Sequence, residues 1–200
     1  HGGEQFDFEL PLAGLYNVQN ALAAAASAVA LGLPHDAIRS ALDSFEPAFG
    51  RQERFDVDGR EVLVLLAKNP TGLNQVLRTI TARPEGARHF LLFLNDGIAD
   101  GRDISWIWDA DYELIASDSE GVAVVVSGTR AEELALRLKY ADLPATPTVI
   151  HETASALANA IESTPRGETL YIIPTYTAML EVRELLAKRA SKRPFWEQAS

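Results

Sequence analysis

Residues 60–82 read REVLVLLAKNPTGLNQVLRTITA, and this stretch decides the fold class. Residues 60–67 are an almost continuous apolar run, which is typical of a strand buried on both faces. Apolar residues then recur across 71–82 at the spacing of one helical face. They are Leu73, Val76, Leu77 and Ile80. A buried strand that leads through a short polar loop into an amphipathic helix is the unit from which parallel α/β sheets are built.

The same unit recurs toward the C-terminus. Further apolar runs predict strands at HFLLFL (89–94), VAVVVSG (122–128), PTVIH (147–151) and ETLYIIPTY (168–176). Each run precedes a helical pattern, and the patterns are ISWIWDADYELIAS, RAEELALRLKYA, SALANAIEST and TAMLEVRELLAKR. Alternating strands and helices imply right-handed crossovers within one sheet. We therefore predict an α/β fold, a Rossmann-like parallel sheet flanked by helices and preceded by a helical segment.

The N-terminal part has a different character. The segment LYNVQNALAAAASAVALGL (15–33) is rich in alanine, which is a strong helix former. Pro34 interrupts it, and HDAIRSALDSF (35–45) resumes the helical pattern. The chain thus divides into a mostly helical segment, residues 1–48, and an α/β domain, residues 49–200. The sequence opens at HGGEQ rather than at methionine, so we expect a fragment or a processed product.

Composition narrows the function classes. A net charge of −10 argues against a protein that binds nucleic acid or anionic membranes. Because the chain has no cysteine, disulfides, thiolate metal sites and a cysteine nucleophile within it are excluded. No apolar stretch is long enough to cross a bilayer and no signal peptide opens the chain. We therefore expect a cytoplasmic protein rather than an integral membrane protein.

Polar groups follow every predicted strand. In open parallel sheets, ligands bind beyond the carboxyl ends of the strands. The groups expected at that edge are Lys68-Asn69-Pro70, an acidic loop at 95–103, Ser127-Gly128-Thr129-Arg130, His151-Glu152 and Pro174-Thr175-Tyr176. Their convergence predicts a functional site at this edge of the sheet.

The stretch NDGIADGRDISWIWDADYE (95–113) carries five aspartates and one glutamate, and three interpretations of it stay open. Asp96, Asp100 and Asp103 offer oxygen ligands for magnesium or calcium, although their spacing is not that of an EF-hand. Asp103 is also placed to cap a helix that begins near Ile104. The third interpretation is a carboxylate that orients a histidine, as in a catalytic triad. The other members of such a triad would come from another chain.

Two tryptophans stand in the same stretch. Trp106 and Trp108 lie two residues apart and cannot share one helical face. Tryptophan is enriched in protein interfaces, so we expect at least one of them to be partly exposed or in an interface. Core packing is the expected role of the other.

Anion contacts are predicted at three places. Lys68 and Asn69 lie between a strand and a helix, where an anion can meet the helix N-terminus, but the sequence has no Walker A motif. Arg51, in FGRQER, can clamp an anion with two hydrogen bonds. Thr129-Arg130 resembles an anion-facing helix start, and helix capping is an equal alternative there.

Several stretches together resemble one known family. In chain order they are GLYNVQNALAAAASAVALGL, FGRQER, LLAKNPTGLNQVL, NDGIADGRDISWIWDADYE, SGTRAEELALRLKYA and PTYTAML. They are similar to the C-terminal part of the MurT family, the Mur-ligase-like subunits of lipid II isoglutaminyl synthase. The resemblance spans nearly the whole chain, and ADGRDISWIWDADYE (99–113) is its most specific element.

The resemblance implies a Mur ligase type of C-terminal α/β domain, with residues 1–48 as the tail of the central ATPase domain. It also implies an ATP-dependent carbon–nitrogen ligase of peptidoglycan biosynthesis, acting on lipid II at the inner face of the membrane. In the family, ATP activates the α-carboxylate of D-glutamate in the stem peptide, and ammonia then displaces phosphate. The partner glutaminase GatD releases that ammonia from glutamine with a cysteine and a histidine. The aspartate of the GRDxSW motif, Asp103 here, completes the partner's pair.

The resemblance also implies roles for further residues. Those at the partner interface or the site rim are Asp100, Arg102, Trp106, Trp108, Asp109, Thr129 and Arg130. Those near the nucleotide are Asn17 and Asn20 at the adenine edge, Arg51 at phosphate, and Lys68 and Asn69 in place of the Mur ligase AHxP segment. The aspartate that contacts ribose in Mur ligases is replaced by Leu65.

The family's other metal and nucleotide motifs do not occur in these 200 residues. They are the P-loop, the magnesium ligands of the central domain and a four-cysteine zinc ribbon. We therefore expect ATP and Mg²⁺ to be cofactors of the full-length subunit, zinc to belong only to the missing central domain, and this chain alone to be inactive.

Two other hypotheses come from different function classes. A standalone α/β module would bind a divalent metal or a nucleotide through the acidic loop. An ordinary Mur ligase that adds an amino acid is disfavoured, because the DNPR-type motif that binds the amino acid is replaced by Ser127-Gly128-Thr129-Arg130.

Overall fold

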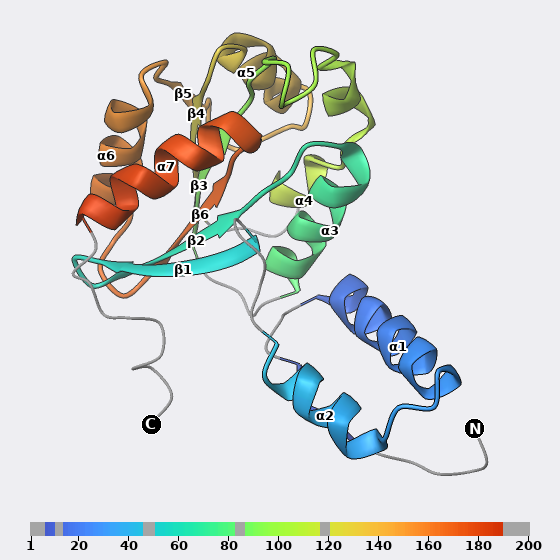
Figure 1. The fold of residues 1–200 in the computed structure, drawn as a ribbon. Coiled ribbons are helices and arrows are strands. Elements are labelled where there is room, and N and C mark those ends of the chain that lie inside the picture. Colours follow the sequence, from blue (N-terminus) through green and yellow to red (C-terminus); the bar gives the residue numbers. More distant parts are fainter. Residues whose placement is uncertain (1–6, 11–13, 46–50, 83–86, 117–120, 190–200) are drawn as a thin grey trace. The chain divides into compact units, whose positions relative to one another are not determined.

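The computed structural model describes residues 7–10, 14–45, 51–82, 87–116 and 121–189, and it separates into two compact units, residues 1–49 and 50–200. The first unit contains α1 (Leu15–Ala30) and α2 (His35–Asp43), on either side of the predicted break at Pro34 (Figure 1). Ala21 and Ala25 of α1 are buried, so the small side chains of the alanine-rich segment form its packing face. The assignment of this unit to the end of an ATPase domain stays a prediction.

The second unit is built on a six-stranded sheet with the order β1-β2-β6-β3-β4-β5. Every adjacent pair is parallel except β1 and β2. The strands are β1 (Arg51–Val57), β2 (Arg60–Leu65), β3 (Arg88–Phe93), β4 (Val122–Ser127), β5 (Thr148–Val149) and β6 (Thr169–Ile173). The α/β class and the Rossmann-like parallel core of the sheet are confirmed.

Helices cover both faces of this sheet (Figure 1). One face carries α3 (Pro70–Thr81), the 3₁₀ helix η1 (Ser105–Asp109), α4 (Glu113–Ala116) and α5 (Ala131–Lys139); the other carries α6 (Thr153–Ser163) and α7 (Tyr176–Arg189). Alternate residues of β2 serve the two cores: Leu63 and Leu65 pack in the first, and Val62 and Val64 in the second. This double burial explains the continuous apolar run.

Strand β1 was not predicted, and it makes the sheet mixed rather than wholly parallel. Its sequence RQERFDV is rich in charge, which hides the strand pattern. The signal that identifies it is Asp58-Gly59, which joins β1 to β2 in a two-residue hairpin with φ of 53° and 76°. Positive φ at both residues is the requirement of a type I′ turn, for which Asp-Gly is a preferred sequence.

The single helix predicted after the acidic loop is wrong, because η1 and α4 are two short pieces. Arg137 of α5 holds the break between them. Its Nε donates to the carbonyl oxygen of Ile107 (3.1 Å) and its Nη2 to that of Ala110 (2.7 Å). These two bonds tie the end of η1, and the residue that follows it, to α5 at the point where the helix is interrupted. Within the described residues, no helix combines the length and apolar character that a membrane span requires.

Candidate functional site

The carboxyl ends of β2, β6, β3, β4 and β5 meet at one edge of the sheet, because these strands are parallel. The acidic loop leaves β3 there, beside the loop that leads from β4 into α5 and the start of α7 after β6. The predicted convergence of polar groups at this edge is confirmed. The groups differ, however, in whether they face solvent or one another.

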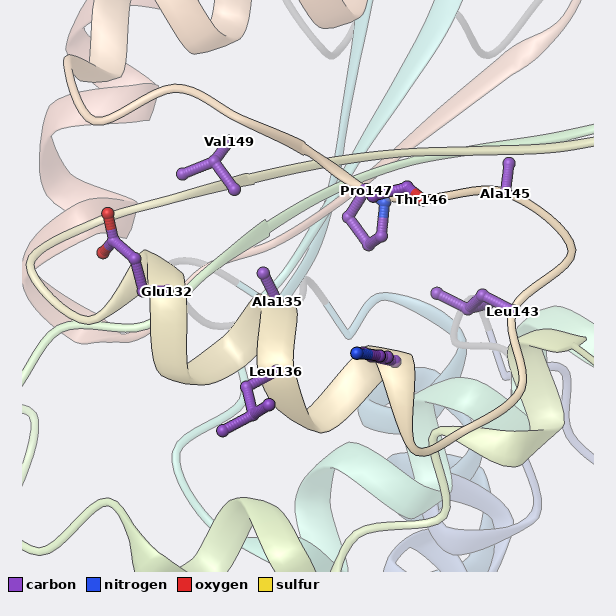
Figure 2. Close-up of a pocket in the computed structure, with 9 residues that line it drawn as sticks. Glu132, Ala135, Leu136, Leu143, Ala145, Thr146, Pro147 and Val149 are labelled. Carbon is purple, nitrogen blue, oxygen red and sulfur yellow. The ribbon is translucent and has the colours of Figure 1, made fainter.

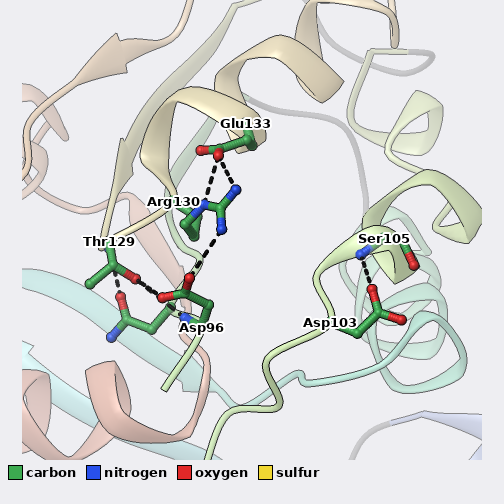
Figure 3. Close-up of polar contacts among 7 residues, drawn as sticks. Asp96, Asp103, Ser105, Thr129, Arg130 and Glu133 are labelled. Atoms are coloured by element: carbon green, nitrogen blue, oxygen red, sulfur yellow. Dashed lines mark hydrogen bonds and ion pairs between the residues drawn. The ribbon is translucent and has the colours of Figure 1, made fainter. Parts of the chain in front are cut away.

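Asp103 is exposed (Figure 3). Its Oδ1 accepts a hydrogen bond from the backbone N–H of Ser105 (2.8 Å), at the start of η1, and its second oxygen points away from Ser105. The side chain and then the backbone N–H of Ser105 hold the pKa of this carboxyl below its usual value. Asp103 thus bonds the first N–H of η1, although the N-cap position is Ile104 and not Asp103, and its carboxylate stays ionised and open to solvent.

Asp96 faces inward to α5 (Figure 3). It accepts from the Thr129 hydroxyl (2.9 Å) and from Arg130 Nη1 (3.0 Å), and Arg130 Nε also donates to Glu133 (2.6 Å). The hydrogen bond from Arg130 is the main cause that lowers the pKa of the Asp96 carboxyl. Arg130 is thus neutralised by two carboxylates of its own domain, which disfavours it as a receptor for an external anion.

Asp100 is buried, with 5% of its surface exposed. Its Oδ1 accepts from the backbone N–H of Thr177 and its Oδ2 from the Thr177 hydroxyl, both at 2.7 Å. Asp100 therefore binds the first turn of α7 and does not offer its carboxylate to a partner surface.

These separate partners do not favour a metal site in the acidic loop. Asp96 is paired with Arg130, Asp100 with Thr177 and Asp103 with Ser105. Among the residues that the structure describes, no three His, Cys, Asp or Glu side chains are grouped to hold a metal ion.

The candidate nucleotide residues are spread over both units. Asn17 is half-buried and Asn20 exposed on α1. Arg51 begins β1, but its side chain lies outside the described residues. Lys68 is exposed after β2, and the Asn69 side chain accepts from Gly72 N–H (2.7 Å) as the N-cap of α3. Since Asn69 already occupies a free N–H of that helix, Lys68 is the residue of this segment that remains for an anion.

The tryptophans of η1 divide as expected. Trp108 is 50% exposed and meets Tyr140, the C-cap residue of α5, edge-on, with ring centroids 5.6 Å apart. Trp106 is half-buried against the core. Arg102 and Asp109 are both exposed. Trp108, one member of an exposed aromatic pair, therefore lies on the same short segment as Asp103, and Tyr140 reaches it from the end of α5.

Comparison with known proteins identifies the family. A family model described as "MurT ligase C-terminal" matches residues 66–179. This chain belongs to the MurT family. It is 39% identical over 183 residues to the MurT subunit of lipid II isoglutaminyl synthase from Streptococcus pneumoniae, covering 92% of this chain and 40% of that protein. The corresponding Staphylococcus aureus subunit is 37% identical over 179 residues, which cover 90% and 40%.

Solved structures agree on the fold of this MurT chain. MurF from Acinetobacter baumannii superposes with a TM-score of 0.66 at 22% identity, covering 90% of this chain and 39% of that one. Folylpolyglutamate synthase from Mycobacterium tuberculosis, solved with ADP and AMPPCP, gives 0.66 at 21% identity, covering 94% and 43%. The MurT chain thus has the fold of the C-terminal part of Mur ligases, and it spans about two fifths of the curated relatives above.

Two features of the α/β unit of this MurT chain were missed by sequence reasoning. Asn95 and Thr177 link the ends of β3 and β6, through Asn95 Nδ2 and Thr177 Oγ1 at 2.8 Å. A groove of about 500 Å³ lies between α5 and the following loop (Figure 2). Most of the residues that line it are apolar, and Glu132 and Lys139 are the charged residues of the lining. Neither feature has a local motif, because each joins side chains from separate segments.

Proposed function

We propose that this chain is the C-terminal portion of a MurT-type subunit that works with a GatD-type glutaminase. The complex uses ATP and glutamine to amidate the α-carboxylate of D-glutamate in the stem peptide of lipid II, at the inner face of the cytoplasmic membrane. Since the chain spans about 40% of its curated relatives, this activity belongs to the whole subunit and its partner.

The observation that carries the proposal is the state of Asp103. Its carboxylate is exposed, its pKa is lowered, and within the described residues no lysine or arginine pairs with it. A buried carboxylate, or one already paired with a cation of its own domain, could not bind a histidine of a second subunit. An ionised carboxylate at the surface, held in place by Ser105, is able to accept the Nδ1–H of a histidine from another chain.

The chemistry follows from that contact. Asp103 fixes the tautomer of the partner's histidine and stabilises the imidazolium formed when the histidine takes the thiol proton. The thiolate attacks the side-chain amide of glutamine, the acyl-enzyme forms and ammonia leaves; water then releases glutamate. In the ligase subunit, the substrate carboxylate would attack the γ-phosphorus of ATP, form an acyl phosphate and release ADP. Ammonia attacks that carbonyl, phosphate leaves, and the amide remains.

The aromatic surface beside Asp103 suits a protein partner. Trp108 and Tyr140 expose 50% and 66% of their surfaces, and Leu136 lies one turn before Tyr140 on the same face of α5. Tryptophan and tyrosine are enriched among the residues that dominate binding energy. Trp108, with Arg102 and Asp109, would contact the glutaminase, whereas Asp100, Thr129 and Arg130 support the segment from within.

The nucleotide contacts of this chain are limited to a few groups. Asn17 and Asn20 would meet the adenine edge, and Arg51 and Lys68 the phosphates. Leu65 is 4% exposed, so the position that holds a ribose-binding aspartate in Mur ligases has no polar group to offer. ATP supplies the phosphoryl group that activates the substrate carboxylate, and Mg²⁺ and zinc would be held by the rest of the subunit.

The test is Asp103→Asn in the full-length subunit assembled with its glutaminase. Asparagine keeps the size of the side chain but removes the charge that the imidazolium needs. Glutamine-dependent amidation should fall about 10⁴-fold, the loss typical of a triad aspartate replaced by asparagine. Amidation driven by added ammonium chloride should remain at the wild-type rate, because it bypasses the glutaminase.

Asp111→Asn is the matched control, since Asp111 lies in the same stretch and only forms an exposed ion pair with Arg78. It should leave both rates unchanged. Equal glutamine-dependent rates for Asp103→Asn and the wild type would contradict the triad role.

A further inference from the structure

The acidic loop is fastened to the start of α7 by a chain of hydrogen bonds. Thr177, the second residue of α7, donates its backbone N–H and its hydroxyl to the two oxygens of Asp100, each at 2.7 Å. The same hydroxyl accepts from Asn95 Nδ2 at 2.8 Å. Asn95 Oδ1 in turn accepts from the backbone N–H of Thr129 at 2.9 Å. One chain of contacts therefore joins the ends of β3, β4 and β6.

These hydrogen bonds have a fixed direction. The Thr177 hydroxyl has one hydrogen, and it is given to Asp100 because a carboxylate only accepts. The hydroxyl oxygen is then free to accept from the Asn95 amide. The Thr129 N–H requires the carbonyl end of Asn95 on its side, which places the NH₂ end toward Thr177. Removing the hydroxyl takes away the partner of Asp100 Oδ2 and of Asn95 Nδ2, while the bonds from the backbone N–H groups of Thr177 and Thr129 remain.

The turn that precedes Asp103 is closed around the same carboxylate. The backbone N–H groups of Asp100 and Gly101 both donate to the Gly97 carbonyl at 3.0 Å. A Cβ added to Gly97 would lie 2.9 Å from Asp100 Oδ2, so the turn fits closely against that oxygen. Asp103 follows three residues later, and its own hydrogen bond reaches only to Ser105, two residues on. Its place relative to the sheet is therefore set through Asp100 and η1.

We propose that Asp100 and Thr177 are positioning residues for Asp103, and that their contact sets the rate of glutamine-dependent amidation without touching any substrate. This inference rests on the proposed function. A misplacement of about 1 Å at a catalytic group costs on the order of a hundredfold in rate. If the contact between Asp100 and Thr177 is lost, Asp103 moves and no longer orients the partner's histidine correctly. The ligase reaction with free ammonia does not use that histidine and is unaffected.

The test compares Thr177→Val with Thr177→Ser in the full-length subunit assembled with its glutaminase. Valine keeps the shape of threonine and the backbone N–H but removes the hydroxyl; serine keeps both donors. Thr177→Val should lower kcat for glutamine-dependent amidation about 10- to 100-fold with little change in the KM for glutamine. Its ammonia-dependent rate should equal that of the wild type, and Thr177→Ser should restore the glutamine-dependent rate.

Thr79→Val is the matched control, because the Thr79 hydroxyl only bonds to the Gln75 carbonyl within α3. It should change neither rate. If Thr177→Val does not assemble with the glutaminase, Asp100→Asn makes the same comparison. Asparagine keeps an acceptor for the Thr177 N–H. It replaces the oxygen that accepts the Thr177 hydroxyl hydrogen with an NH₂ group, so that hydrogen loses its acceptor.

The outcomes separate the two proposals when Asp103→Asn is measured alongside. In one outcome, Asp103→Asn loses glutamine-dependent activity while Thr177→Val, or Asp100→Asn where it is used instead, keeps the wild-type rate. That result leaves the proposed function standing and overturns the positioning role. An equal fall of the glutamine-dependent and ammonia-dependent rates also overturns it, since it would indicate general damage. No loss in Asp103→Asn overturns the proposed function itself.

Discussion

Gly128 lies where the loop after β4 passes closest to the end of β3. Its φ is +104°, and an added Cβ would lie 2.5 Å from the Leu94 carbonyl oxygen and 2.6 Å from Asn95 Oδ1. The position therefore requires glycine twice, for its backbone conformation and for its lack of a side chain. This close approach allows the Thr129 N–H to reach Asn95, and so it holds one end of the chain of hydrogen bonds that supports the acidic loop.

Gly128→Ala should lower the free energy of unfolding by about 2–4 kcal/mol, from a strained φ and a steric clash together. The matched control is Gly167→Ala, where φ is +84° but no atom lies within 4 Å of the added Cβ. It should cost only about 1–2 kcal/mol, from the backbone alone. Urea unfolding of both variants measures the difference, and equal losses would contradict the steric argument.

At the residue scale, the sequence singled out Asp103 as a candidate but not the contacts that anchor the acidic loop before it. Asp103 stands in a dense local motif. The contact between Asn95 and Thr177 joins positions 82 residues apart, and neither residue type is rare in loops. The same limit applies to Asp100. Its charge pointed to the surface, while the contact that buries it lies 77 residues further along the chain.

At the element scale, η1 and α4 depend on Arg137 of α5. The residue is 5% exposed, and its guanidinium bonds two backbone carbonyls and Glu113 and lies 5.3 Å from the centre of the Tyr112 ring. The sequence predicted one helix here because the apolar spacing is continuous. That spacing does not record a cation from another helix that bonds the carbonyls of Ile107 and Ala110 where the two pieces meet. The strand and helix positions of α3, β3, β4 and α5 were predicted because each depends on its own residues.

Arg137→Met should cost about 2–4 kcal/mol of unfolding free energy, because two buried carbonyls lose a charged donor while the apolar stem is kept. Arg78→Met is the matched control: Arg78 also pairs with this segment, at Asp111, but both side chains are half exposed. That substitution should cost about 0–1 kcal/mol. Chemical denaturation of the two variants checks this, and a similar cost for both would show that burial is not what matters at Arg137.

At the scale of the whole molecule, the sheet edge was predictable and the strand order was not. Parallel strands necessarily bring their following loops to one edge, so the site could be located from the strand–helix rhythm alone. The insertion of β6 between β2 and β3 follows from packing across the whole sheet, which no local pattern records. The charged strand β1 was recognisable only from its Asp-Gly turn.

The arrangement of the whole molecule gives Asp103 its proposed role. Interior contacts occupy Asp96, Asp100 and Arg130, and among these groups Asp103 is the one left exposed, on a segment that also exposes Trp108. A carboxylate in this position is accessible to a histidine of a neighbouring subunit.

The most direct test is the distance between Asp103 and the partner's catalytic histidine in an experimental structure of the assembled complex. We expect a carboxylate oxygen of Asp103 to lie within about 3.2 Å of a ring nitrogen of that histidine, with the side chains of this subunit excluding water around the pair. A histidine that is held by a carboxylate of its own subunit, with Asp103 left in solvent, would contradict it.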